Sequence, residues 1–175
     1  MNEVKTIFEP PSVALIGSSV IQEKVGMTSP QLFRNVIYNM KKFFGGKTFV
    51  LDVDGKADYE HLNDLPEVPE LAVIMLPPKQ SLIQAKECTK KGVKALVIIT
   101  GGYDDEQRQQ LLKLKGEYGI RTLGPNTIMG IINTANGLNT TFERDVMPER
   151  GSISVISQSG GVGACLLDWA CFYRI

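Results

Sequence analysis

The stretch from Ser12 to Gly26 constrains the fold more than any other part of the chain. An apolar run ends at Gly17, the small residues Ser18 and Ser19 follow, and a Ser-Pro pair then opens a helical pattern. Serine is a favoured N-cap, and proline is favoured at the first position of a helix. A small-residue loop before a helix N-terminus gathers backbone N–H groups at the positive end of the helix dipole. The stretch therefore predicts a loop that holds phosphate.

Apolar, β-branched segments alternate along the chain with segments of helical periodicity. Helices are expected after an N-cap at Ser29, from about Lys79 to Lys91, and from Asp104 or Asp105 to about Tyr118. Strands are expected at residues 12–17, 48–53, 71–76, 95–100 and 121–123. This alternation predicts an α/β fold, namely a Rossmann-like, open, mainly parallel sheet with helices on both faces.

Small-residue turns follow four of the expected strands. Ligands of open parallel sheets bind beyond the carboxyl ends of the strands, so these turns predict a single binding edge. The turns are Gly17–Ser19, Pro77–Pro78, Thr100–Gly102 and Gly124–Asn126.

A charged segment with a proline, residues 143–150, separates this alternation from one more strand–helix pattern. Ser152–Ile156 is expected to be a strand, Ser157–Gly161 a second small-residue turn, and Val162 the start of a helix. A single such unit cannot bury both faces of a parallel strand, so we expect it to open a second, truncated domain. The expected division is residues 1–142 as the first domain, 143–150 as a linker, and 151–175 as the first β-α unit of an incomplete domain.

The composition narrows the class of protein. Nineteen basic residues balance nineteen acidic ones, so no overall charge favours nucleic acid or an anionic membrane. The acidic N-terminus does not resemble a signal peptide, and no apolar run approaches a membrane span. The scattered cysteines Cys88, Cys165 and Cys171 indicate reduced, helix-packing thiols in a cytoplasmic protein, without a metal site.

Several stretches, in the same order along the chain, resemble the N-terminal part of a known family. The resemblance is to the CoA-binding domain of the α-type subunit of ADP-forming acyl-CoA (acetyl-CoA) synthetases, in the succinyl-CoA synthetase superfamily. The most specific stretches are Gly124-Pro-Asn126, then Leu138-Asn-Thr-Thr-Phe142, then Ser157-Gln-Ser-Gly160.

This resemblance implies CoA or acyl-CoA as the ligand of the first domain, with a loop of the second domain steadying a phosphohistidine. It implies a reaction in which acyl-CoA, ADP and phosphate give acid, ATP and CoA. The positions that match the family's CoA contacts are Gly17, Ser18, Ser19, Lys24, Val25, Gly26, Pro77 and Asn126. The positions that match its second loop are Ser157, Gln158, Ser159 and Gly160.

The sequence departs from the family in two places. The loop after the second strand is shortened, because Leu51–Asp54 runs directly into Gly55–Tyr59. The phosphohistidine is absent, because the only histidine is His61 in the first domain, where a surface position is expected. We therefore expect the chain to be catalytically incomplete alone, with a partner that carries the phosphohistidine and ATP-grasp domains. A stand-alone CoA-binding or regulatory module, without catalysis, is the alternative.

Two other classes stay open. An NAD(P)-binding oxidoreductase would use Asp52 to bind a ribose diol, although the loop lacks the Gly-x-Gly-x-x-Gly spacing. Asp52 is otherwise expected to be a solvated turn residue, while Lys24 and Lys56 are candidates to neutralise CoA phosphates. A purely structural module is the last class. The apolar strand expected in residues 151–175 needs a partner, either the edge of the first sheet or another copy of the chain.

Overall fold

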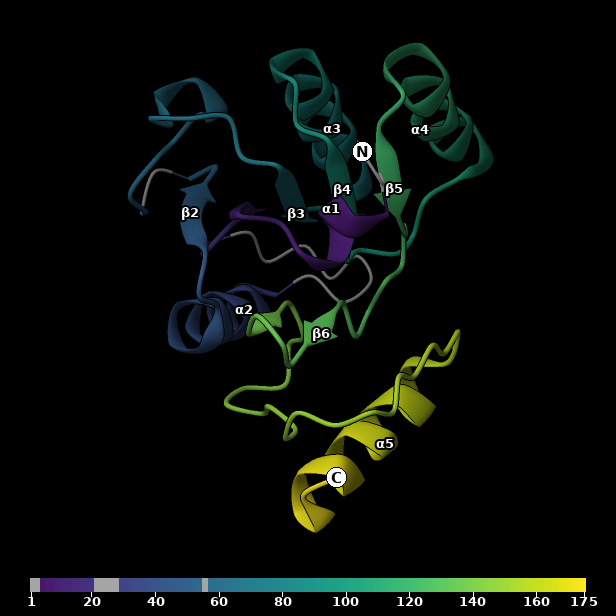
Figure 1. Cartoon of the computed structure of the whole chain (residues 1–175). Helices are drawn as coiled ribbons and strands as arrows, with labels where there is room; N and C mark the ends of the chain where they lie inside the picture. The colour runs from purple at the N-terminus through teal and green to yellow at the C-terminus, as the bar shows by residue number, and fades with distance from the viewer. Residues whose placement is uncertain (1–3, 21–28, 55–56) are drawn as a thin grey trace.

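Five parallel strands form the central sheet of the computed structural model, which describes residues 4–20, 29–54 and 57–175 (Figure 1). They are β1 (Ser12–Gly17), β2 (Lys47–Asp52), β3 (Leu71–Met75), β4 (Ala95–Ile98) and β5 (Arg121–Leu123). Their order in the sheet is β2-β1-β3-β4-β5, and every neighbouring pair is parallel. The five predicted strands are thus confirmed, with ends that differ by one or two residues.

The three long helices between these strands begin as predicted. The helices are α2 (Pro30–Phe43), α3 (Pro78–Lys91) and α4 (Asp105–Tyr118). The Ser29 hydroxyl caps α2 by accepting the Leu32 N–H at 3.2 Å. Asp104 caps α4, because its carboxylate accepts the Gln107 N–H at 2.8 Å while the Gln107 side chain accepts the Asp104 N–H.

Shorter elements were missed from the sequence. They are the single-turn helix α1 (Lys5–Phe8), the 3-10 turn η1 (Leu62–Asp64), and a hairpin of β6 (Ile132–Asn133) with β7 (Leu138–Asn139). Elements of two to four residues are too short for a hydrophobic period to show.

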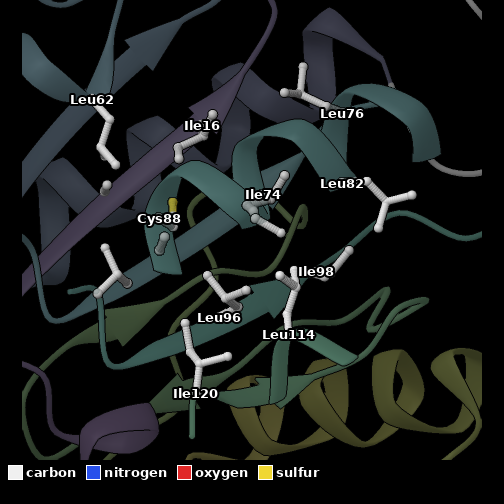
Figure 2. Close-up of a cluster of buried hydrophobic side chains, with 14 of the residues drawn as sticks. Ile16, Leu62, Ile74, Leu76, Leu82, Cys88, Leu96, Ile98, Leu114 and Ile120 are labelled. Carbon is white, nitrogen blue, oxygen red and sulfur yellow. The ribbon is translucent and has the colours of Figure 1, made fainter. Parts of the chain in front are cut away.

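The sheet is buried on both faces because alternate side chains of each strand enter different cores. Helices α3 and α4 cover one face, where Leu82, Cys88 and Leu114 pack on the strands (Figure 2). Helix α2, with α1 and the β6-β7 hairpin, covers the other face. The fully buried strand residues are shared between the two, with Ala14 and Ile16 on the first face and Val13 and Leu15 on the second.

The chain changes direction across the sheet between β1 and β3. From β1 it passes through α2 to β2 at one edge, and it then returns to the opposite side of β1 to form β3. Ligands of open α/β sheets bind outside the carboxyl ends of the strands where the order reverses in this way. The topology therefore places the binding edge beside Gly17, which lies in register with Asp52 on β2 and Met75 on β3.

The C-terminal part forms a helix without the strand expected before it. Helix α5 (Gly160–Tyr173) is present, but residues 152–156 form no strand, so that prediction is wrong. A strand needs a neighbour to bond its backbone. These residues are instead exposed, and Ile156 is 98% accessible. Among the described residues, no helix is long and apolar enough to cross a membrane.

The segment before α5 is held against the first domain by buried amide side chains. Asn39, fully buried on α2, donates to the carbonyl oxygens of Thr141 (3.0 Å) and Glu143 (2.8 Å) and accepts the Asp145 N–H (2.8 Å). Asn139 donates to the Val146 carbonyl oxygen at 2.6 Å. The start of the expected linker, residues 143–150, is therefore fixed in place.

Replacing Asn39 by alanine is expected to lower the free energy of unfolding by about 2–4 kcal/mol, because three backbone groups, the Thr141 carbonyl among them in a buried bond, lose their partner. Asn35→Ala is the matched control on the same helix. The half-buried Asn35 makes one such bond, to the Phe142 carbonyl oxygen at 2.9 Å, so its loss should cost about 1 kcal/mol. Urea unfolding followed by circular dichroism measures both, and equal losses would contradict this assignment.

Candidate functional site at the carboxyl edge of the sheet

The loop after β1 is fixed to the end of β2 by two carboxylates. Asp52 is 2% exposed, and its carboxylate accepts the Ser19 N–H at 3.3 Å and the Asp54 N–H at 3.1 Å. The Ser18 hydroxyl donates to the Asp54 carboxylate and accepts the Val20 N–H at 3.0 Å. The backbone N–H groups of Ser19 and Val20 are thus already bonded to side chains, that of Ser19 to Asp52 on β2 and that of Val20 to Ser18.

Asp52 is therefore neither the solvated turn residue that the sequence suggested nor a carboxylate facing solvent. Its backbone is held as well. The Asp52 N–H donates to the Tyr59 carbonyl oxygen at 3.2 Å, and Leu51 and Tyr59 form a parallel bridge. The shortened loop after β2 thus closes directly on the strand that precedes it.

Gly17 allows α2 to lie directly beneath the loop. A Cβ on this residue would come within 2.5 Å of the Phe33 ring, closer than real side chains approach. Phe33 lies on the first turn of α2 and is buried in the core of that face. Glycine at the end of β1 therefore sets the close packing of strand, loop and helix that phosphate-binding folds use.

The turns after β3, β4 and β5 lie at the same edge. Pro77 is buried and accepts the Ser81 N–H at 2.8 Å as α3 begins. The Asn126 N–H donates to the Thr100 carbonyl oxygen at 2.9 Å, and Asn126 takes a left-handed conformation with φ of 70°. The side chain of Asn126 lies so close to Gly101 that a Cβ there would meet its Oδ1 at 2.6 Å. The structure therefore brings Pro77 and Asn126 to the edge that carries Gly17.

Three buried hydroxyl oxygens lack a hydrogen-bond partner in the part of the chain that the structure describes. They are the Oγ of Ser19, the Oγ1 of Thr100 and the phenolic oxygen of Tyr103. All three follow the carboxyl ends of strands, Ser19 after β1 and the other two after β4. Buried polar groups without partners are rare in folded proteins, so their gathering at one edge makes this edge the candidate site for a polar ligand.

Tyr103 is 4% exposed, so its phenol is almost entirely removed from solvent. Burial raises the pKa of Tyr103 to about 12, and the nearby Ser81 hydroxyl offsets this only in part. Ser81 itself donates to the Leu76 carbonyl oxygen at 2.6 Å. Tyr103 is therefore a neutral hydrogen-bonding group at physiological pH.

The second predicted loop is exposed and internally bonded. The Ser157 hydroxyl accepts the Ser159 N–H at 3.1 Å, and the Ser159 hydroxyl caps α5 by accepting the Val162 N–H at 3.3 Å. Gly160, at the start of α5, lies against Ile128, with 3.7 Å between the position of its absent Cβ and the Ile128 Cβ. The loop thus lies near the segment that follows Asn126. Gln158 is exposed in the same loop.

Other residues singled out in the sequence have simpler roles. His61 is exposed, as expected, and its N–H donates to the Asp64 carboxylate at 3.0 Å. Cys88 is a buried packing residue whose pKa burial raises to about 12, so it is not a reactive thiol. Cys165 is exposed on α5, which corrects the expectation that it packs.

Sequence reasoning missed Tyr103 and Asp54 as members of the edge, and it placed Thr100 there only as part of a turn. The turn Thr100–Gly102 was noted, but nothing in the sequence showed that its hydroxyl would be left without a partner. Lys24, Val25 and Gly26, predicted to contact CoA, lie outside the described residues, as does Lys56.

These features define a nucleotide-binding domain of the Rossmann-like class, with its ligand edge at the reversal between β1 and β3. The chain belongs to the CoA binding domain family, which matches residues 12–133. CoA as the cofactor, predicted from the sequence, is confirmed by this membership.

Known proteins with matching sequences are ligases of one kind. The chain is 35% identical to the α subunit of ADP-forming acetate–CoA ligase II of Pyrococcus furiosus, over 90% of this chain and 35% of that protein. It is 37% identical to the ADP-forming acetate–CoA ligase of Methanocaldococcus jannaschii, over 99% of this chain and 24% of that protein. The predicted relationship to the ADP-forming acyl-CoA synthetases is thereby confirmed.

Solved structures also match the chain in fold and in sequence. PH0766 from Pyrococcus horikoshii superposes with a TM-score of 0.82 at 31% identity, covering 98% of this chain and 40% of that one. The dinucleotide-forming acetyl-coenzyme A synthetase 1 of Candidatus Korarchaeum cryptofilum, in complex with phosphate and ADP, gives 0.77 at 30% identity, over 98% and 37%. The chain therefore spans well under half the length of each of these relatives.

The buried phenol of Tyr103 predicts a loss of stability in alkali. The unfolded chain releases this proton near pH 10, whereas the folded protein holds it to about pH 12. Between these values the folded state binds more protons, so the free energy of unfolding falls as pH rises, by roughly 2 kcal/mol.

Tyr103→Phe should make this fall shallower, and urea unfolding at a series of pH values measures it. Cys88 contributes a similar fall that starts near pH 9, so the variant reduces the slope without abolishing it. Tyr118→Phe, which removes an exposed phenol, is the control. An unchanged slope in Tyr103→Phe would contradict the burial of this group.

Proposed function

We propose that the carboxyl edge of the sheet is the CoA site, and that the residues matching the family's contacts form it. These residues are Gly17, Ser18, Ser19, Lys24, Val25, Gly26, Pro77 and Asn126. The observation that carries the proposal is the set of three buried, unpartnered hydroxyl oxygens at this edge of a CoA binding domain.

Thr100 extends the proposed contact set. It is fully buried, it directly precedes two glycines, and its hydroxyl lacks a partner among the described residues. CoA presents amide, hydroxyl and phosphate groups that can satisfy such a hydroxyl. Bonding it on CoA binding would offset the cost of burying it, which is typically about 1–3 kcal/mol.

The whole-protein activity that we propose is that of an ADP-forming acyl-CoA synthetase, an acid–thiol ligase. In that reaction acyl-CoA, ADP and phosphate give acid, ATP and CoA. Support comes from the ligases that the chain matches along almost its entire length. His61, the only histidine, is exposed between β2 and β3, so these 175 residues do not supply a phosphohistidine at the CoA edge. A partner subunit or chain would carry it, together with the ATP-grasp part.

The domain division belongs to the same proposal. Residues 1–142 form the CoA-binding domain, 143–150 connect it, and 151–175 open a succinyl-CoA-ligase-like domain, with Ser157, Gln158, Ser159 and Gly160 as its phosphate loop. Support comes from the apolar side chains that this last part exposes, because large exposed apolar surfaces mark contacts with other protein. They include Ile156, Trp169 and Phe172. Pairing of copies through this part and a cytoplasmic location complete the proposal.

A stand-alone CoA-binding module is the second candidate. The single, exposed His61 favours it over an enzyme complete in itself. Acyl-CoA synthesis that appears only when this chain is added to a partner carrying the missing parts would decide against the module.

Calorimetric titration with CoA tests the site. Thr100→Val removes the unpartnered hydroxyl and keeps the shape, so we expect it to raise the stability of the chain without ligand and to weaken CoA binding about tenfold. Thr48→Val is the control. Thr48 is the second residue of β2, near the amino end of the strand and away from the candidate edge, so this variant should bind CoA as the unaltered chain does.

Absence of saturable CoA binding by the unaltered chain would overturn the proposed function. Equal CoA affinity in Thr100→Val and Thr48→Val would remove Thr100 from the site and leave the rest of the proposal in place.

A further inference from the structure

The loop after β2 carries an excess of negative charge beside the proposed ligand edge. Residues 52–58 contain three aspartates, Asp52, Asp54 and Asp58, against one lysine, Lys56. Of these three aspartates, Asp58 is the one that forms an ion pair with another described residue, Lys41, at 3.9 Å. The partners that the structure gives to Asp52 and Asp54 are backbone N–H groups and the Ser18 hydroxyl.

These carboxylates are fixed relative to the β1 loop. Asp52 lies in register with Gly17, and its carboxylate is tied to the Ser19 N–H. Asp54 is exposed, yet it is held by the Ser18 hydroxyl at the start of the same loop. A ligand whose phosphates lie over the β1 loop must therefore pass a negative charge on the β2 side.

The topology of the sheet predicts which part of a bound nucleotide lies beside the Asp52 and Asp54 carboxylates. In sheets of this kind the pyrophosphate lies over the loop after β1, and an acidic residue at the end of β2 faces the ribose hydroxyls. A ribose diol donates hydrogen bonds to a carboxylate. A 3′-phosphate in the same place carries a charge of about −1.5 to −2 and is repelled by it.

We infer that Asp54, positioned through Ser18 and supported by Asp52, makes this site select a CoA molecule whose ribose lacks the 3′-phosphate. The inference rests on the proposed function, because it takes the nucleotide of CoA to lie across this edge. It assigns to the shortened loop a role in specificity: the site binds dephospho-CoA more tightly than CoA.

The test is a calorimetric titration of the full chain with CoA and with dephospho-CoA, at low and at high salt. We expect dephospho-CoA to bind about tenfold more tightly at low salt, from like-charge repulsion near the protein surface. Added salt should narrow the difference, because it screens charges at exposed positions.

Asp54→Asn is the informative variant, since it removes the exposed charge and keeps a hydrogen-bonding side chain. It should raise the affinity for CoA and bring the two ligands to within about twofold of each other. Glu149→Gln makes the same change of charge at an exposed position in the segment leading to α5, and it should leave the preference unaltered. Asp52→Asn is a second test of the preference for dephospho-CoA over CoA, and circular dichroism verifies that this variant is folded.

The outcomes separate the two claims. Tighter binding of dephospho-CoA that is lost in Asp54→Asn supports the inference. CoA binding as tightly as dephospho-CoA, or more tightly, overturns the inference and leaves the CoA site standing. If neither CoA nor dephospho-CoA shows saturable binding, the proposed function is overturned, and the inference is overturned with it.

Discussion

The close packing of the Phe33 ring against Gly17 is the contact on which the ligand edge depends. The ring occupies the space where any larger residue would place its Cβ, so α2 begins directly beneath the end of β1. Gly17 also lies in register with Asp52 on β2, and two residues later the Ser19 N–H donates to the Asp52 carboxylate. The end of β1 is thus held on one side by α2 and on the other by β2.

Much of this architecture could be predicted from the sequence because its signals are local. Five apolar strands, the Ser29 and Asp104 caps, and the glycines after α3 and α4 each follow from the neighbouring residues. The parallel sheet with helices on both faces followed from the alternation of strands and helices. The prediction of a strand at Ser152–Ile156 was wrong because an apolar, β-branched run shows only that a strand is possible. Whether a partner strand lies beside it is not a local property.

The candidate site was less predictable, for a related reason. The positions of Gly17 and Asn126 at one edge followed from the expected topology, and the structure agrees. That Thr100 and Tyr103 would be buried without partners depends on what surrounds them in three dimensions, which no spacing in the sequence reveals. The burial of Asp52 depends likewise on Tyr59, seven positions further on, returning to the strand.

The three hydrogen bonds of Asn39, which together clamp residues 141–145 to α2, affect which substitutions this segment tolerates. All three bonds reach backbone groups of Thr141, Glu143 and Asp145, and none reaches a side chain. Substitutions in that segment therefore leave the clamp intact so long as the backbone keeps its course. Replacement of Asn39 itself would remove all three bonds at once, so the course of the chain from the sheet towards α5 depends on the amide at this one helical position.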